Sequence, residues 1–153
     1  MYLEIVGFVK EGGYIQNGYD YGCSPGKFDV YVYRVTHTDC NGVVFEYSPS
    51  QLEEYCQRKG IKSVKTLYYG KAKNLFDLDV HEHWHQNFLL EMIATYLEKN
   101  CELCKNKVPD EGIVLRRDVP NQIDVYKLKS FKFLERETKE LDNENFIDLE
   151  VQN

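Results

Sequence analysis

Three charged side chains near the C-terminal end of the sequence could act together on a phosphate. Glu111 precedes an apolar stretch that ends in two arginines, and Lys127 and Lys129 alternate with apolar residues about fifteen positions further on. Side chains alternate along a strand, so the two lysines should project from one face. Ammonium groups can neutralise charge that develops on a phosphoryl group, and a carboxylate can hold the divalent cation that accompanies it. If the two strands are neighbours, these groups form one site; otherwise they are ordinary surface charges.

A small mixed fold must position these residues. Strands and helices alternate irregularly along the sequence, which favours an α+β fold with a mainly antiparallel sheet and two principal helices. Glycine, asparagine and aspartate recur in residues 11–27, as in a turn-rich excursion, and residues 39–42 suit a hairpin. The predicted strands are 2–10, 28–36, 43–47, 64–69, 113–117 and 123–129, and the predicted helices are 49–59 and 87–99, followed by a polar, acidic tail.

Two of these elements carry strong local signals. Residues 28–36 alternate so that Val32 and Val35 fall on opposite faces, and both faces are partly apolar, which predicts a central strand. Ser48 and Gln51 form a capping box before the first helix, and Gly60 suits a left-handed stop.

Composition limits the class of protein. The chain has 153 residues, 42% of them hydrophobic, which is enough for one ordinary core, and we expect one compact unit. A net charge of -6 argues against bulk binding of nucleic acid, although a local basic cleft remains compatible with it. The N-terminus lacks the pattern of a signal peptide, nowhere do eighteen apolar residues run together, and five cysteines form no even framework. We therefore expect a soluble, cytoplasmic protein with no membrane partner.

Two motifs resemble those of covalent nucleotidyltransferases, and most closely those of ATP-dependent RNA ligases. Residues 111–116, Glu-Gly-Ile-Val-Leu-Arg, are similar to the family's motif IV, Glu-Gly-aliphatic-Val-aliphatic-Lys/Arg. Residues 127–131, Lys-Leu-Lys-Ser-Phe, are similar to motif V, in which Lys-x-Lys precedes a polar and aromatic stretch. The two motifs occur in the family's order and at about its spacing.

The N-terminal half extends the resemblance to about residue 137. Glu4 matches a family glutamate that lies against the nucleoside, although Leu3 stands where glycine is usual. Tyr33 falls at the motif III position whose aromatic ring stacks on adenine, and tyrosine offers a similar flat face. The resemblance thus implies an ATP-grasp-like ligase half-domain in residues 1–137 and an acidic polar tail in residues 138–153.

The resemblance also implies roles for single residues. Glu111 would act in catalysis by ordering Mg²⁺ or Mn²⁺, and Lys127 and Lys129 would hold the α-phosphate. Glu4, Tyr33 and Arg116 would bind the nucleotide. The implied cofactors are ATP and the divalent metal, and the implied partners are ATP or AMP and RNA 5′-phosphate and 3′-hydroxyl ends.

The family's nucleophile is missing from this sequence. A lysine in Lys-x-Asp-Gly attacks ATP and becomes lysyl-AMP, and it normally lies upstream of the strand that here contains Glu4. No Lys-x-Asp-Gly occurs in the 153 residues, and Lys10-Glu11-Gly12-Gly13 fits a turn better. Whether the chain is an enzyme therefore stays open: it is a split or truncated product, a fragment, or a non-catalytic nucleotide- or RNA-binding module. We expect an uncovered sheet edge, and hence an N-terminal ligase half as partner or self-association.

Two other patterns could bind zinc. Residues 81–85 satisfy His-Glu-x-x-His, but the helix is expected to begin only near Trp84, so the two histidines would not share one helical turn. Cys101 and Cys104 form one Cys-x-x-Cys, which leaves two alternatives, free thiols or a weak zinc site. A histidine among residues 81–85 could complete that site, but the predicted helix would hold it about 20 Å away.

Overall fold

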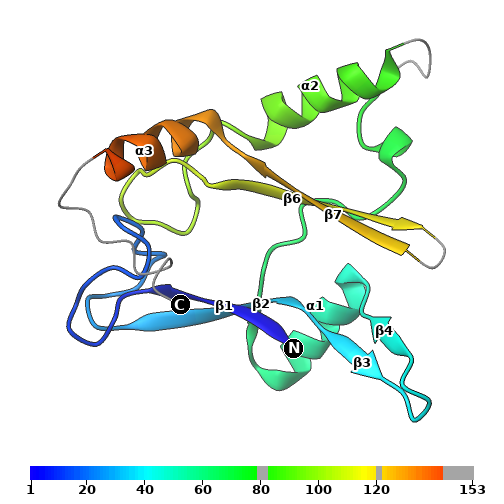
Figure 1. Cartoon of the computed structure of the whole chain (residues 1–153), viewed down its shortest axis with the longest axis horizontal. Coiled ribbons are helices and arrows are strands. Elements are labelled where there is room, and N and C mark those ends of the chain that lie inside the picture. Colours follow the sequence, from blue (N-terminus) through cyan, green and yellow to red (C-terminus); the bar gives the residue numbers. More distant parts are fainter. Residues whose placement is uncertain (79–82, 120–121, 143–153) are drawn as a thin grey trace. The chain divides into compact units, whose positions relative to one another are not determined.

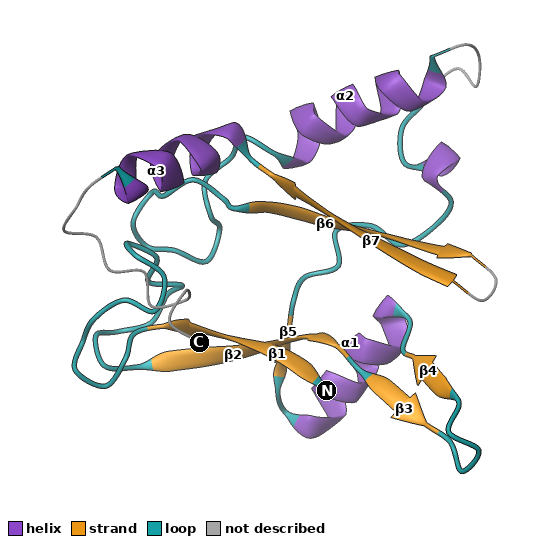
Figure 2. Ribbon diagram, viewed as in Figure 1, coloured by secondary structure: helices purple, strands orange, loops and turns teal. Residues whose placement is uncertain are grey.

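The computed structural model describes residues 1–78, 83–119 and 122–142. The chain divides into two compact units, Met1–Lys71 and Ala72–Gln152, where the sequence predicted one. Each unit contains helices and strands, and the pairings β1–β2, β3–β4 and β6–β7 are all antiparallel (Figure 2). The prediction of an α+β fold is therefore confirmed.

The first unit is built on a three-stranded sheet. Its strands are β1 (Tyr2–Gly7), β2 (Phe28–Arg34) and β5 (Lys62–Ser63), in the order β1-β2-β5. Figure 1 labels β1 and β2, and Figure 2 also labels β5. β1 is antiparallel and β5 parallel to β2. β2 is thus central, as its two partly apolar faces predicted. β3 (Thr36–Thr38) and β4 (Val44–Glu46) form the expected hairpin.

Helix α1 (Pro49–Lys59) packs on this sheet and begins and ends as the sequence predicts. Ser48 and Gln51 form the capping box, and Gly60 is left-handed with φ 65°. Leu52 and Cys56 of α1 are buried with Val32 and Val35 in one apolar cluster. Burial raises the pKa of the Cys56 thiol, because the low-dielectric surroundings disfavour the thiolate.

A bulge in β2 overturns the predicted alternation. Tyr2 pairs with Arg34 but Leu3 pairs with Val32, so Tyr33 is an extra residue on β2. A bulge shifts the side chains beyond it to the other face. Val35 therefore lies in the same cluster as Val32, and the prediction of opposite faces is wrong.

Two strand predictions in the first unit differ from the structure. β1 ends at Gly7, because Phe8 pairs separately with Tyr14, whereas the sequence predicted a strand to residue 10. The strand predicted at 64–69 is absent: β5 stops at Ser63, and one further bond joins Val64 N to Val32 O at 3.0 Å. The bulge in β2 begins at Tyr33, the residue after Val32. A bulged strand bends, so β2 offers residues 64–69 no regular edge for pairing.

The second unit contains a β-ribbon that lies between two α-helices in chain order. Its elements are the 3-10 helix η1 (Ala72–Asn74), α2 (Trp84–Tyr96), β6 (Gly112–Val119), β7 (Gln122–Lys129) and α3 (Phe131–Leu141). β6 and β7 are paired along their whole length, as predicted. Met92 and Leu97 are buried against Ile113, with Leu128 packed beside them.

Both α-helices of this unit differ from the prediction. α2 begins at Trp84, where the helix start was expected, although the apolar spacing indicated only 87–99. It ends at Tyr96 rather than at residue 99, because Leu97 is extended and Glu98 is left-handed with φ 54°. α3 was not predicted, because the sequence after the strand 123–129 suggests only a polar, acidic tail. The fold thus has three α-helices among the described residues rather than two, and the expected tail boundary at residue 137 falls inside α3.

Candidate functional site

Glu111 and Lys127 meet on one face of the β6–β7 ribbon. Glu111 directly precedes β6, and Lys127 lies opposite Val114 on β7. The Lys127 ammonium group forms an ion pair with Oε1 of Glu111. The lysine side chain is 56% exposed and the glutamate side chain 27%. The predicted neighbouring strands therefore do bring this acid and this lysine together.

Lys129 lies on the same face but has a different carboxylate partner. It is opposite Gly112, two positions along β7 from Lys127. Its Nζ atom lies 3.0 and 3.1 Å from the two carboxylate oxygens of Glu137 and 5.0 Å from the centre of the Phe133 ring. Both partners belong to α3, so the missed helix fixes this lysine. The N-cap signal of Ser130 could have revealed it.

Arg116 completes the polar face. Directly opposite residues share a face of a sheet, and alternate residues along one strand do too. Arg116 therefore lies on the side of Val114 and Lys127, and its Nε donates to Asp118 at 2.6 Å. Val114 and Val125 on this face are 62% and 61% exposed. Three cations thus border an exposed apolar strip, and each has a carboxylate partner: Glu111, Glu137 and Asp118.

Near Glu111 the opposite face of the ribbon is apolar and packs in the core. Ile113 is buried, and Leu115 and Leu128 pack against the cluster that contains Met92 of α2. This division explains why Lys127, Lys129 and Arg116 lie on one face. The period of two in β6 and β7 assigns one face to the core and the other to solvent.

Gly112 allows the two strands to approach closely beside Glu111. Its φ is 145°, which L side chains rarely adopt, and a Cβ atom here would lie 1.9 Å from the backbone oxygen of Leu128. Only glycine fits this position without moving β7. The glycine that follows Glu111 is therefore required for this close approach of the two strands.

A buried hydrogen-bond network ties Glu111 to α3. Ser130 is 0% exposed, and its N–H donates to Glu111 O at 2.9 Å. Its hydroxyl donates to Asp110 O at 2.7 Å and accepts the N–H of Phe133 at 3.1 Å, which caps α3. Burial raises the pKa of the Asp110 carboxyl, although Lys99 at 4.0 Å opposes this shift. The start of β6 and the start of α3 are thereby held together.

Glu98 provides a second cap for α3. Its carboxylate accepts the backbone N–H groups of Phe131 and Lys132, the first at 2.5 Å and the second at 3.3 Å. A carboxylate at a helix N-terminus satisfies otherwise unpaired N–H groups and complements the helix dipole. Sequence analysis missed Glu98 because it lies 33 residues from Phe131.

Glu4 and Tyr33 belong to the first unit. Glu4 is exposed and lies opposite Tyr31 across β1 and β2. Tyr33 is 49% exposed in the bulge, and its ring centre lies 6.4 Å from that of Tyr2. The Arg34 guanidinium covers the Tyr2 ring at 4.9 Å. An acid and several rings therefore line this part of the sheet.

The two zinc patterns differ in how much of them the structure describes. His81 and Glu82 lie outside the described residues, while α2 begins at Trp84, as the sequence predicted. Cys101 and Cys104 are partly buried in the loop before β6, and neither forms a disulfide. Within residues 1–78, 83–119 and 122–142, no three or more His, Cys, Asp or Glu side chains form a group suited to a metal.

Comparison with known proteins gives no assignment: no family model, curated protein or solved structure matches this chain. Among the helices of the described parts, none has both the length and the apolar character needed to cross a membrane.

Proposed function

We propose that the chain is an RNA ligase-like adenylyltransferase segment that binds ATP or AMP with a divalent metal and serves the joining of RNA ends. The main support is the common polar face of β6 and β7. On it Lys127 is paired with Glu111, and Lys129 and Arg116 follow along the same two strands. Three cations on one face, each with a carboxylate partner, suit a nucleotide phosphate, and Glu111 suits its metal.

In this proposal the two lysines exchange their carboxylate partners for phosphate. Lys127 pairs with Glu111 and Lys129 with Glu137 in the chain without nucleotide. An α-phosphate between the lysines would accept their N–H groups, and the oxygens of Glu111 would become available. Nucleotide therefore competes with two internal ion pairs, which are partly exposed and hence weak.

Glu111 has the chemistry that Mg²⁺ or Mn²⁺ requires. It is a hard oxygen donor with a partly exposed side chain. Mg²⁺ is commonly held by one or two carboxylates together with phosphate oxygens and water, so a single glutamate beside the lysines is sufficient. When bound, the metal would neutralise phosphate charge; Glu111 would orient it.

Within the first unit, Tyr33 and Glu4 keep the nucleoside-binding roles that the resemblance implies. The exposed Tyr33 ring offers a face for stacking on adenine, and Glu4 would accept hydrogen bonds from ribose hydroxyl groups.

A non-catalytic nucleotide- or RNA-binding module is the second candidate. One observation favours it, the absence of Lys-x-Asp-Gly from the 153 residues. Under the first candidate, a lysine-bearing part completes the site; under the second, binding is the whole function.

Calorimetric titration of the chain with ATP, with and without Mg²⁺, tests the nucleotide site shared by both candidates. Lys127→Ala should weaken ATP binding about tenfold or more, because a charge-assisted contact is lost. Glu111→Gln should remove the Mg²⁺ dependence. Arg117→Ala is the matched control, because Arg117 alternates with Arg116 and pairs with Asp124 on the other face. Equal losses in Lys127→Ala and Arg117→Ala would reject the proposed site.

A further inference from the structure

A second concentration of positive charge lies outside the candidate site, between Glu54 and Asp77. Residues 55–76 contain six of the 19 lysines and arginines and none of the 25 acidic residues, although the whole chain has a net charge of -6. Uniform mixing of charges would place several acids in a stretch of this length. The segment is therefore a basic region within an acidic protein.

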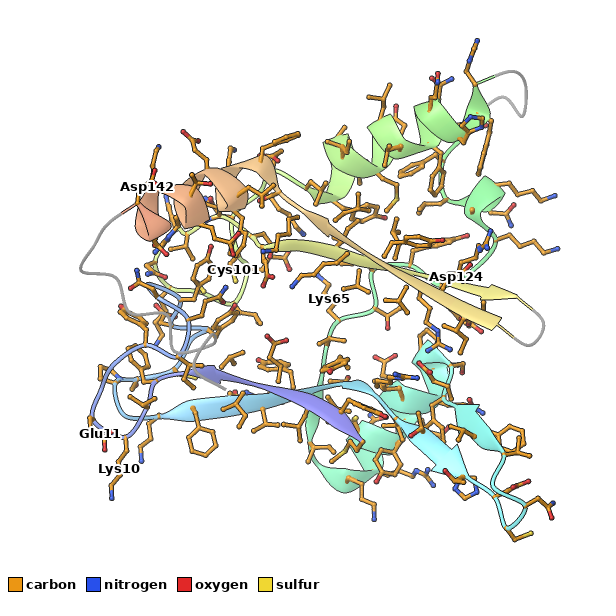
Figure 3. The ribbon with its side chains drawn as sticks, viewed as in Figure 1. Lys10, Glu11, Lys65, Cys101, Asp124 and Asp142 are labelled. Atoms are coloured by element: carbon orange, nitrogen blue, oxygen red, sulfur yellow. The ribbon has the colours of Figure 1, made fainter. Side chains whose placement is uncertain are left out.

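After α1, the part of this region in the first unit has an exposed stretch without helix. Arg58 and Lys59 end α1, and Lys62 lies in β5, where it pairs with Asp29. Residues 64–71 follow without helix or strand, and all eight are exposed (Figure 3, which labels Lys65). One hydrogen bond within this stretch joins Tyr68 Oη to Lys71 O at 2.9 Å.

Aromatic side chains are interleaved with these cations. Tyr69 is 60% exposed and Tyr68 is 39% exposed, between Lys65 and Lys71. Single-stranded nucleic acids bind surfaces on which flat rings lie between cations. The bases stack on the rings, and the phosphates contact the cations.

We propose that residues 58–71 bind single-stranded RNA. Lys65 and Lys71 contact successive phosphates, and one base stacks on Tyr69. An acidic peptide would match the charge but has no base to stack on the ring, so the aromatic residues favour RNA. The choice of RNA as the nucleic acid rests on the proposed function, and this inference adds a surface of the first unit that holds the strand.

Fluorescence anisotropy with a labelled twelve-nucleotide oligouridylate measures this binding at several salt concentrations. Tyr69→Ala should weaken binding about tenfold, and Tyr69→Phe, which keeps the ring, should bind like the unmodified chain. Lys65→Ala/Lys71→Ala should reduce the slope of log affinity against log salt by about 1.4, since each lost phosphate contact removes about 0.7.

Lys105→Ala/Lys107→Ala is the matched control, because both lysines are exposed in another loop. It should leave affinity and slope nearly unchanged. The inference is overturned if this control weakens binding as much as Lys65→Ala/Lys71→Ala, if Tyr69→Ala binds normally, or if a twelve-residue glutamate peptide competes as well as unlabelled RNA. ATP titration of the same variants separates the two proposals: RNA binding that depends on Tyr69 in a chain that binds no ATP supports this surface and rejects the proposed nucleotide site.

Discussion

Replacing Gly112 with alanine should separate the two strands that carry the candidate site. The added Cβ would lie 1.9 Å from Leu128 O and 2.9 Å from Lys129 Cα, whereas ordinary contact begins at 3.4 Å. The strands must therefore move apart by about 1.5 Å at this point, the difference between 3.4 and 1.9 Å. Loss of two ladder hydrogen bonds costs about 2 kcal/mol. The left-handed backbone adds about 1–2 kcal/mol, for a total of about 3–4 kcal/mol.

Urea unfolding followed by far-UV circular dichroism and by Trp84 fluorescence measures this loss. Trp84 reports on the same unit, since its ring stacks on Phe88 at 5.0 Å. Gly42→Ala is the control for backbone strain alone, because Gly42 has φ 82° and nothing within 4 Å of an added Cβ. It should cost about 1–2 kcal/mol. If the two variants lose the same stability, the close approach of β6 and β7 is refuted.

Four further outcomes are expected. Ser130→Ala should cost about 2–3 kcal/mol in urea unfolding, because it removes a buried cap and a buried donor, against about 1 kcal/mol for the exposed cap in Ser48→Ala; equal costs would contradict the buried network. Burial raises the pKa of Asp110, so the folded chain holds this proton more tightly, and stability falls as pH rises from the unfolded value near 4 through the raised folded value. Asp110→Asn should therefore be more stable than the unmodified chain at pH 7 and lose this advantage near pH 3; an advantage that does not change with pH would reject the ionisation. Incubation with labelled ATP and Mg²⁺ should leave no acid-resistant label on the chain, and label that appears when a Lys-x-Asp-Gly fragment is added would favour the split enzyme over the binding module. Leu3 and Ile5 are 41% and 49% exposed on the edge strand β1, so the chain should self-associate or bind a hydrophobic dye; a dye-free monomer that melts above about 60 °C would contradict this.

The neighbouring of β6 and β7 could be predicted because it needs only a short strand pair. The apolar alternation of residues 113–117 and 123–129 indicates two strands, and their short connection makes them neighbours. Alternation then places Lys127, Lys129 and Arg116 on one face. It does not place Glu111 there, because Glu111 lies just before β6 and next to Gly112, whose φ is 145°. The roles given to Tyr33 and Glu4 came from the resemblance instead, and they stay predictions.

Helix α1 was predictable for a similar reason. Ser48 and Gln51 bond to each other's backbone within three residues, and Gly60 ends the helix by its own conformational freedom. Such signals are local, so the sequence determines them before any tertiary contact forms. The α+β class follows from the same kind of pattern.

Tertiary structure decided the elements that depend on distant partners. The bulge at Tyr33 turns Val35 into the core and leaves β5 without a longer edge to pair with. Helix α3 begins where Glu98, more than thirty residues earlier, caps its first turn, and the backbone oxygen of Asp110 accepts the Ser130 hydroxyl. That helix in turn gives Lys129 its carboxylate partner. These contacts join residues far apart in the chain, and a periodic pattern read along one segment contains no information about them.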